Sequence, residues 1–173
     1  MPARVPGQPF PSVTLAFVDG QTQPIVDQTA PFMTMIDVDR GLHCPRCDRH
    51  LRDIVAQKET FADLGVSVVA VSTDPEDRAR EAVDNWQLGD VPVAFGLPIA
   101  TAQSLGLAIS SAIRDGETSL FTEPGVFFAR ADGTLHGSIV NTFPFARPVV
   151  SDLDDVAQVA KERNYPPRGT WTG

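Results

Sequence analysis

The sequence predicts an α/β fold, a three-layer α/β/α sandwich around a mixed central sheet with an N-terminal β-hairpin extension. The chain has 173 residues, of which 42% are apolar, enough for one packed domain. Over residues 32–109, short apolar runs rich in β-branched side chains alternate with segments of helical periodicity. Asp-Gly turns at Asp19 and Asp132 mark hairpins before and after this alternating part.

The elements are expected in a regular order along the chain. An N-terminal hairpin over residues 12–27 precedes a strand at 32–38, a tight loop and a helix that runs from 47 to 64. A strand at 66–72 has little polar alternation, as a strand buried on both faces would. A helix starts at Asp74-Pro75-Glu76 and reaches Trp86, before a strand at 91–95 and a helix at 100–109.

The second hairpin covers residues 125–140, and a last helix covers 151–163. This order of elements is the thioredoxin-like one. Phe127 and Phe128, on alternate faces of their strand, and Trp86 are expected in the core. We expect a single domain over residues 1–173, with its core at about 9–163 and extended termini.

Charge and hydropathy exclude several classes of protein. The net charge of −8 and the pI near 4.7 argue against binding to nucleic acid or to an anionic membrane. No apolar run approaches the roughly 18 residues of a membrane span, and the N-terminus lacks the apolar core of a secretory signal. We expect a cytoplasmic protein.

The two cysteines form the motif Cys44-Pro45-Arg46-Cys47. A bridge that closes so short a loop stabilises little, so in a reducing compartment the spacing indicates redox chemistry or a metal. Cys44 lies where a loop enters a helix, and the helix dipole and the cation of Arg46 should lower its pKa. Cys47 falls on the apolar helix face and should be the more buried thiol. We therefore expect Cys44 at the rim as the attacking thiol and Cys47 as the resolving one.

The run from Asp39 to Cys47, followed by Arg49 and His50, resembles the redoxin branch of the alkyl hydroperoxide reductase and thiol-specific antioxidant family, the peroxiredoxin-like proteins. The similarity extends over roughly residues 9–163. It implies a thioredoxin-like fold and an antioxidant oxidoreductase with a redox-active centre. The resemblance also implies that thioredoxin or glutathione reduces the oxidised protein again, and that no cofactor takes part.

The sequence departs from that family at the site. Asp37 and Gly41 occupy the positions of the family's Pro and Thr or Ser, and Pro124 occupies that of its Arg. Residues 122–125 look instead like the substrate loop of thioredoxins, which implies a cis peptide bond between Glu123 and Pro124. The loop would present Glu123 and Pro124 to an extended substrate.

Several readings stay open. His43, Cys44, Cys47 and His50 could bind zinc, although all four come from one short segment, and we expect no metal. The cysteines could also be structural. His43 either modulates Cys44 or packs against the loop. Asp37 or Asp39 could relay protons to Cys47, or be a solvated carboxylate.

We expect a thiol-disulfide oxidoreductase that acts on a protein or small-molecule disulfide or thiol. The alternatives are a thiol-dependent peroxidase and a non-catalytic binding domain of thioredoxin fold. Because Gly41 and Pro124 lack the family's donors, peroxide should oxidise Cys44 slowly unless Arg40, His43 or Arg46 is aimed at the site. A homodimer stays open.

Overall fold

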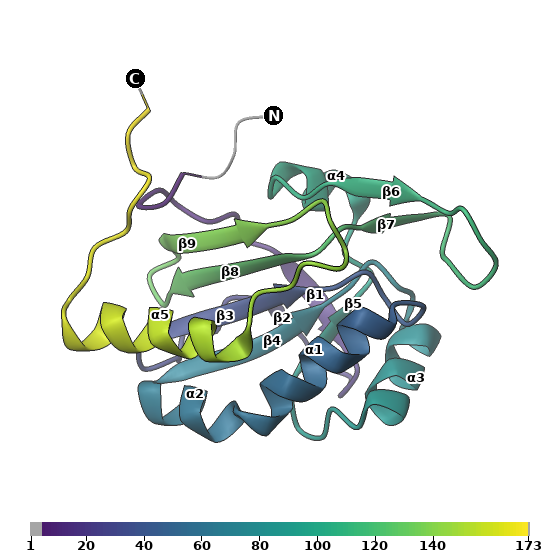
Figure 1. Cartoon of the computed structure of the whole chain (residues 1–173), viewed down its shortest axis with the longest axis horizontal. Helices are drawn as coiled ribbons and strands as arrows, with labels where there is room; N and C mark the ends of the chain where they lie inside the picture. Colours follow the sequence, from purple (N-terminus) through teal and green to yellow (C-terminus); the bar gives the residue numbers. More distant parts are fainter. Residues whose placement is uncertain (1–4, 173) are drawn as a thin grey trace.

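The computed structural model describes residues 5–172, which form a central sheet covered by helices (Figure 1). The strands are β1 (Thr14–Phe17), β2 (Thr22–Pro24), β3 (Met33–Val38), β4 (Val66–Val71), β5 (Val93–Phe95), β6 (Ile109–Ser111), β7 (Leu120–Thr122), β8 (Gly125–Arg130) and β9 (Leu135–Val140). The helices are α1 (Pro45–Ala56), α2 (Lys58–Leu64), α3 (Glu76–Trp86), α4 (Ile99–Ser104) and α5 (Val150–Glu162).

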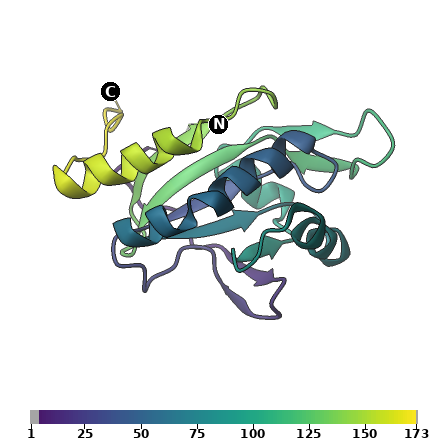
Figure 2. The same ribbon diagram turned by 60° about the horizontal axis from the view of Figure 1, so that its bottom comes forward.

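The main sheet has seven strands in the order β2-β1-β5-β4-β3-β8-β9. β3 is hydrogen-bonded in parallel to β4 and antiparallel to β8, so the sheet is mixed, as the sequence predicts. Both predicted hairpins are present, β1 with β2 at one edge and β8 with β9 at the other. In Figure 2 the β1–β2 hairpin projects below the body of the sheet.

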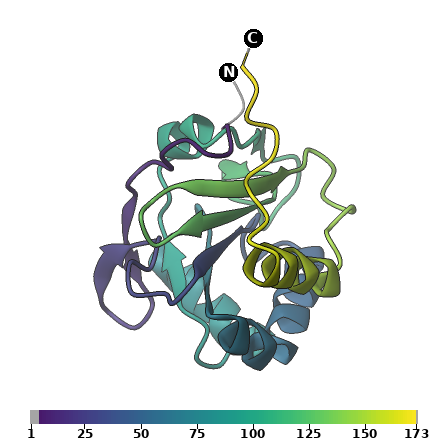
Figure 3. The same ribbon diagram turned by 90° about the vertical axis from the view of Figure 1, so that its left-hand side faces the viewer.

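Successive side chains of β3 point to opposite faces of the sheet. Met33 and Met35 pack with α1, α2, α3 and α5, whereas Ile36 and Val38 pack with α4 and the N-terminal segment around Phe10. Figure 3 shows α5 beside α1 and α2 on one side of the sheet. The predicted three-layer thioredoxin-like fold is confirmed.

Individual core predictions also hold. Phe127 and Phe128 are buried on opposite faces of β8, and Trp86 is buried at the end of α3. No helix in the described part of the chain is long and apolar enough to cross a membrane.

Two local predictions are wrong, and one small element was not predicted. The helix expected over 47–64 is two helices, because Gln57 leaves helical geometry, with φ −112° and ψ 10°. The helix expected over 100–109 ends at Ser104, since Gly106 takes a positive φ of 86°. The chain then forms β6, which pairs with β7 in a two-stranded ribbon that the sequence analysis does not contain (Figure 1).

Candidate active site

The cysteine motif lies beyond the carboxyl end of β3, where residues 39–43 lead into α1. Cys44 is the N-cap of α1, in an extended conformation, and its Sγ accepts the backbone N–H of Cys47 at 3.3 Å. Pro45 stands at the start of the helix, where its missing N–H costs no hydrogen bond. The first thiol therefore sits at the positive end of the helix, as expected.

Both thiols are free and buried, with exposed fractions of 1% for Cys44 and 0% for Cys47. The expectation that Cys44 lies at the rim is therefore wrong. The helix start is covered because β7 and the segment between β9 and α5 lie against it. From β7, the Thr122 hydroxyl donates to the carbonyl of Asp39 at 2.8 Å, and from that segment Phe145 contacts Arg46.

The environments of the two thiols separate their pKa values. A hydrogen bond from the Cys47 thiol, the Cys47 N–H and the nearby Arg40 and Arg147 outweigh burial and lower the pKa of Cys44 to about 5. Burial, and then the neighbouring Cys44 and Asp39, raise the pKa of Cys47 well above its usual value. At neutral pH the pair holds a thiolate at Cys44 and a thiol at Cys47.

This separation predicts a titration. Since a thiolate forms as pH rises through the pKa, the thiolate absorbance of the reduced protein near 240 nm should appear in a step centred near pH 5. Cys44→Ser should remove the step, and Cys47→Ala should move it to higher pH because the donor thiol is lost. A single step at the ordinary thiol value of about 8.5 would contradict the assignment.

Arg147 contacts the thiol pair from a segment 100 residues away in sequence. Its Nη2 donates to Cys47 Sγ at 2.7 Å, and the Arg40 backbone N–H donates to the same sulfur at 3.4 Å. Although burial opposes it, interaction with the neighbouring acidic groups of Cys47, Asp37, Cys44 and Asp39 raises the pKa of Arg147, which keeps the guanidinium charged.

A second guanidinium is held on the other side of the motif. Arg40 Nε lies 3.1 Å from Glu123 Oε2, and the guanidinium stacks over the Phe121 ring, 4.8 Å from its centroid. Glu123 is buried and also accepts the hydroxyl of Ser110 at 2.6 Å. Glu123 therefore orients Arg40 rather than facing a substrate.

The bond between Glu123 and Pro124 is trans, as are all peptide bonds of residues 5–172, so the predicted cis bond is wrong. The backbone at this point already has partners, because the Glu123 N–H donates to Ala108 at 2.8 Å and the Pro124 carbonyl accepts from Asn141 at 3.0 Å. These bonds join β7 and β8 to their neighbours. A thioredoxin-type substrate loop is not formed here.

The four side chains considered for zinc do not converge. His50 Nε2 lies 2.8 Å from Asp37 Oδ2 in a buried pair, while the His43 ring packs edge-on against Phe121 with centroids 4.6 Å apart. Within residues 5–172, no group of three or more His, Cys, Asp or Glu side chains is arranged to hold a metal ion.

The two candidate relay carboxylates differ in their partners. Asp37 is paired with His50, whereas Asp39 Oδ1 accepts the Gly41 N–H at 2.6 Å. Burial raises the pKa of Asp39 well above its usual range, despite the hydrogen bond from Gly41. Of the two residues, Asp39 is therefore the one whose burial beside the thiol pair favours the protonated carboxyl.

Gly41, where the family has Thr or Ser, occupies a position that excludes a side chain. Its φ is 98°, and an added Cβ would lie 2.5 Å from Asp74 Oδ2. That carboxylate is fixed, because it accepts the Leu42 N–H at 2.7 Å. The side chain of the family's Thr or Ser would therefore collide with Asp74 at this position.

Gly41→Ala is expected to lower the free energy of unfolding by about 2–3 kcal/mol, from backbone strain plus displacement of Asp74. Gly20→Ala is the matched control, since Gly20 also has a positive φ of 90° but nothing within 4 Å of an added Cβ. Its cost should be about 1 kcal/mol. Urea unfolding measures both, and equal costs would mean that Asp74 yields freely.

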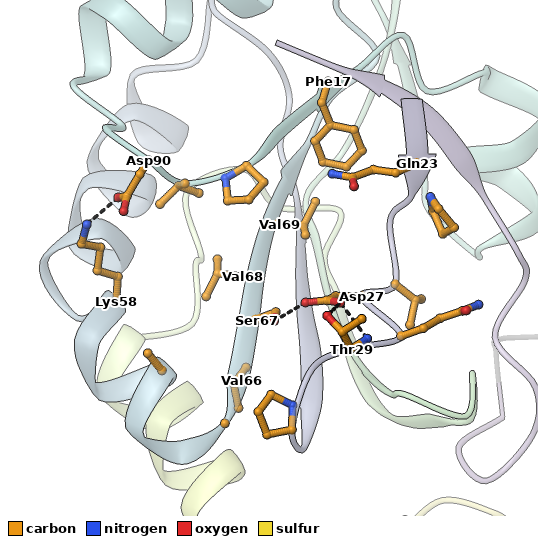
Figure 4. A pocket seen from close by; sticks show the side chains of 18 of the residues that line it. Phe17, Gln23, Asp27, Thr29, Lys58, Val66, Ser67, Val68, Val69 and Asp90 are labelled. Atoms are coloured by element: carbon orange, nitrogen blue, oxygen red, sulfur yellow. Dashed lines mark hydrogen bonds and ion pairs between the residues drawn. The ribbon is translucent and has the colours of Figure 1, made fainter. Parts of the chain in front are cut away.

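A cleft of about 790 Å³ lies elsewhere, beside the first residues of β4 (Figure 4). Four of its polar side chains form pairs: Ser67 donates to Asp27 at 2.6 Å, and Lys58 forms an ion pair with Asp90. None of the residues that line it belongs to the cysteine motif. It is not part of the candidate active site.

The structure brings together some predicted residues and separates others. His43, Cys44, Pro45 and Cys47 lie at the thiol pair, whereas the Arg46 guanidinium lies over the Phe145 ring, 5.7 Å from its centroid. The sequence analysis missed Arg147, Phe121 and Asp74. Each of the three is a single residue far from the motif in sequence, and no sequence pattern links it to the motif.

Comparisons with known proteins identify the family that the sequence matches. The model of the AhpC/TSA family matches residues 6–138. No curated protein matches the sequence.

Solved structures share the fold at low sequence identity. A cysteine-to-serine mutant of the peroxiredoxin 6 of Arenicola marina has a TM-score of 0.80 at 18% identity, covering 94% of this chain and 76% of that one. The peroxidoxin BcpB of Mycobacterium tuberculosis has a TM-score of 0.74 at 14% identity, covering 90% and 97%. Reduced Prx3 of Vibrio vulnificus, in complex with H2O2, has a TM-score of 0.74 at 15% identity, covering 89% and 99%.

The family match spans most of the chain, including the cysteine motif, and the fold agrees over nearly all of it. The chain therefore belongs to the AhpC/TSA family, a family of thiol-based oxidoreductases.

Proposed function

We propose that this protein is a thiol-dependent peroxidase in which Cys44 reduces a hydroperoxide and Cys47 resolves the product. The observation that carries the proposal is the contact of the Arg147 guanidinium with the buried thiol pair, at 2.7 Å from Cys47 Sγ. It supplies, from another part of the chain, the cation that Pro124 cannot. The expectation of slow peroxide oxidation depended on the lack of that cation and of a hydroxyl at Gly41.

Burial of both sulfurs favours a small substrate. Exchange with a protein disulfide needs a sulfur atom to approach in line, and with Cys44 only 1% exposed a folded partner cannot reach it without local opening. The trans bond at Pro124 also removes the feature that favoured an extended substrate. A hydroperoxide needs far less room.

The reaction balances with the thiol pair alone. The Cys44 thiolate attacks one peroxide oxygen, an S–O bond forms, and the O–O bond breaks with its electron pair on the departing oxygen. That oxygen takes a proton and leaves as water or an alcohol, so sulfur is oxidised and the peroxide is reduced. Cys47 then attacks the sulfenic acid, and its proton leaves with the hydroxyl as water.

A thiol reductant must then reopen the disulfide. Thioredoxin or glutathione fits this step, and the need for re-reduction favours a reducing compartment such as the cytoplasm. Among structures of similar fold, Prx3 of Vibrio vulnificus is in complex with H2O2, which supports peroxide as the substrate class.

Stopped-flow oxidation of the reduced protein by H2O2 and by an organic hydroperoxide tests the proposal. The second-order rate constant should exceed that of a free thiolate by about a hundredfold or more. A small disulfide is tested in parallel, because disulfide exchange is the competing function. Fast disulfide exchange with peroxide oxidation at the free-thiolate rate would reject the peroxidase.

A further inference from the structure

Peroxide reduction places negative charge on the departing oxygen, and a donor aimed at that oxygen accelerates the step. Three residues of the motif region carry suitable N–H groups: Arg40, His43 and Arg46. Two already have partners. The Arg40 guanidinium is ion-paired with Glu123, stacked on Phe121 and hydrogen-bonded to the Cys44 sulfur, and the Arg46 guanidinium lies over an exposed phenylalanine.

His43, directly before the attacking cysteine, is different. Both ring nitrogens are buried, and neither has a hydrogen-bond partner among residues 5–172. The ring is held edge-on against Phe121. A buried donor without a partner costs about 1–3 kcal/mol, so this arrangement is costly unless a transient ligand meets it.

The imidazole is also in the right protonation state. Burial and the positive charge of Arg40 lower the pKa of His43, so the ring is neutral at neutral pH and carries one N–H. A neutral donor adds no third cation beside Arg40 and Arg147. It offers a hydrogen bond that becomes stronger only when charge appears opposite it.

We propose that His43 is a catalytic residue whose ring N–H donates a hydrogen bond to the departing peroxide oxygen as the O–O bond breaks. This inference rests on the proposed function. The ring keeps its proton, and the oxygen takes its proton from water. His43 thus serves in place of the hydroxyl that Gly41 lacks.

His43→Phe is the decisive variant, because phenylalanine preserves the aromatic packing on Phe121 and removes the N–H. The rate constant for oxidation by H2O2 should fall by about a hundredfold. Alkylation of Cys44 by iodoacetamide at the same pH should change by less than about threefold, because the departing iodide needs no hydrogen bond. His43→Gln, which restores a side-chain N–H donor, should recover most of the peroxide rate.

The rates of peroxide oxidation and of alkylation together distinguish a role of His43 toward the departing oxygen from a general effect on Cys44. If peroxide oxidation and alkylation fall in the same proportion, or if His43→Phe oxidises at the wild-type rate, the inference is wrong. If His43→Phe does not fold, His43→Leu against His43→Gln gives the same comparison. The wild-type peroxide rate tests the proposed function, whereas only the ratio of variant to wild type tests His43.

Discussion

Serine at position 44 is expected to reduce peroxide consumption at least about a thousandfold, to the background of free reductant. The hydroxyl of serine stays protonated in an environment that holds Cys44 as a thiolate, with a pKa of about 5. Consumption of H2O2 with dithiothreitol as the reductant measures the effect.

Cys47→Ser is the matched control, since it keeps the attacking thiol. Reduced beforehand and freed of dithiothreitol, it should consume one equivalent of peroxide and stop, leaving a sulfenic acid on Cys44 that mass spectrometry detects as one added oxygen. If Cys44→Ser consumed peroxide and Cys47→Ser did not, Cys47 would be the attacking thiol and Cys44 the resolving one.

Arg147→Gln is expected to lower the rate constant for peroxide oxidation by about a hundredfold. The guanidinium contacts Cys47 Sγ at 2.7 Å and also helps to lower the pKa of Cys44, so its loss removes a donor to Cys47 and part of the charge stabilisation of the Cys44 thiolate. The thiolate step near 240 nm should move to higher pH in the same variant. Stopped-flow kinetics and the titration measure the two effects.

Arg80→Gln controls for the loss of a positive charge, because Arg80 is exposed and pairs only with Glu76 on the surface of α3. It should oxidise at the wild-type rate. If Arg147→Gln does the same, the contact is structural, and the main support for the peroxidase is gone.

The sequence was sufficient for the parts of the fold that depend on local patterns. Strand β3, the loop and helix α1 follow from apolar periodicity, and the place of Cys44 at the helix start follows with them. The burial of Cys44 could not be predicted, because it comes from β7 and from the segment after β9. Nothing within the motif itself encodes those contacts.

The same limit applies to the site residues. Arg147 reaches Cys47 across 100 residues, from a segment without periodicity. Position 41 has no room for a side chain because of Asp74, which belongs to another loop. The cis bond at Pro124 was expected from resemblance alone, and the hydrogen bonds of Glu123 and Pro124 show a different use of that loop.

The sulfur of Cys44 is at once the reacting atom and the N-cap of α1, since it accepts the Cys47 N–H at 3.3 Å. A thiolate at the N-cap stabilises the helix start strongly, whereas a sulfur in a disulfide is a poor hydrogen-bond acceptor. The loss of a cap costs about 1 kcal/mol of helix stability. Each oxidation therefore loosens the first turn of α1, and each reduction tightens it again. Amide hydrogen exchange at Cys47 would report the redox state of the protein from its backbone, without any probe of sulfur.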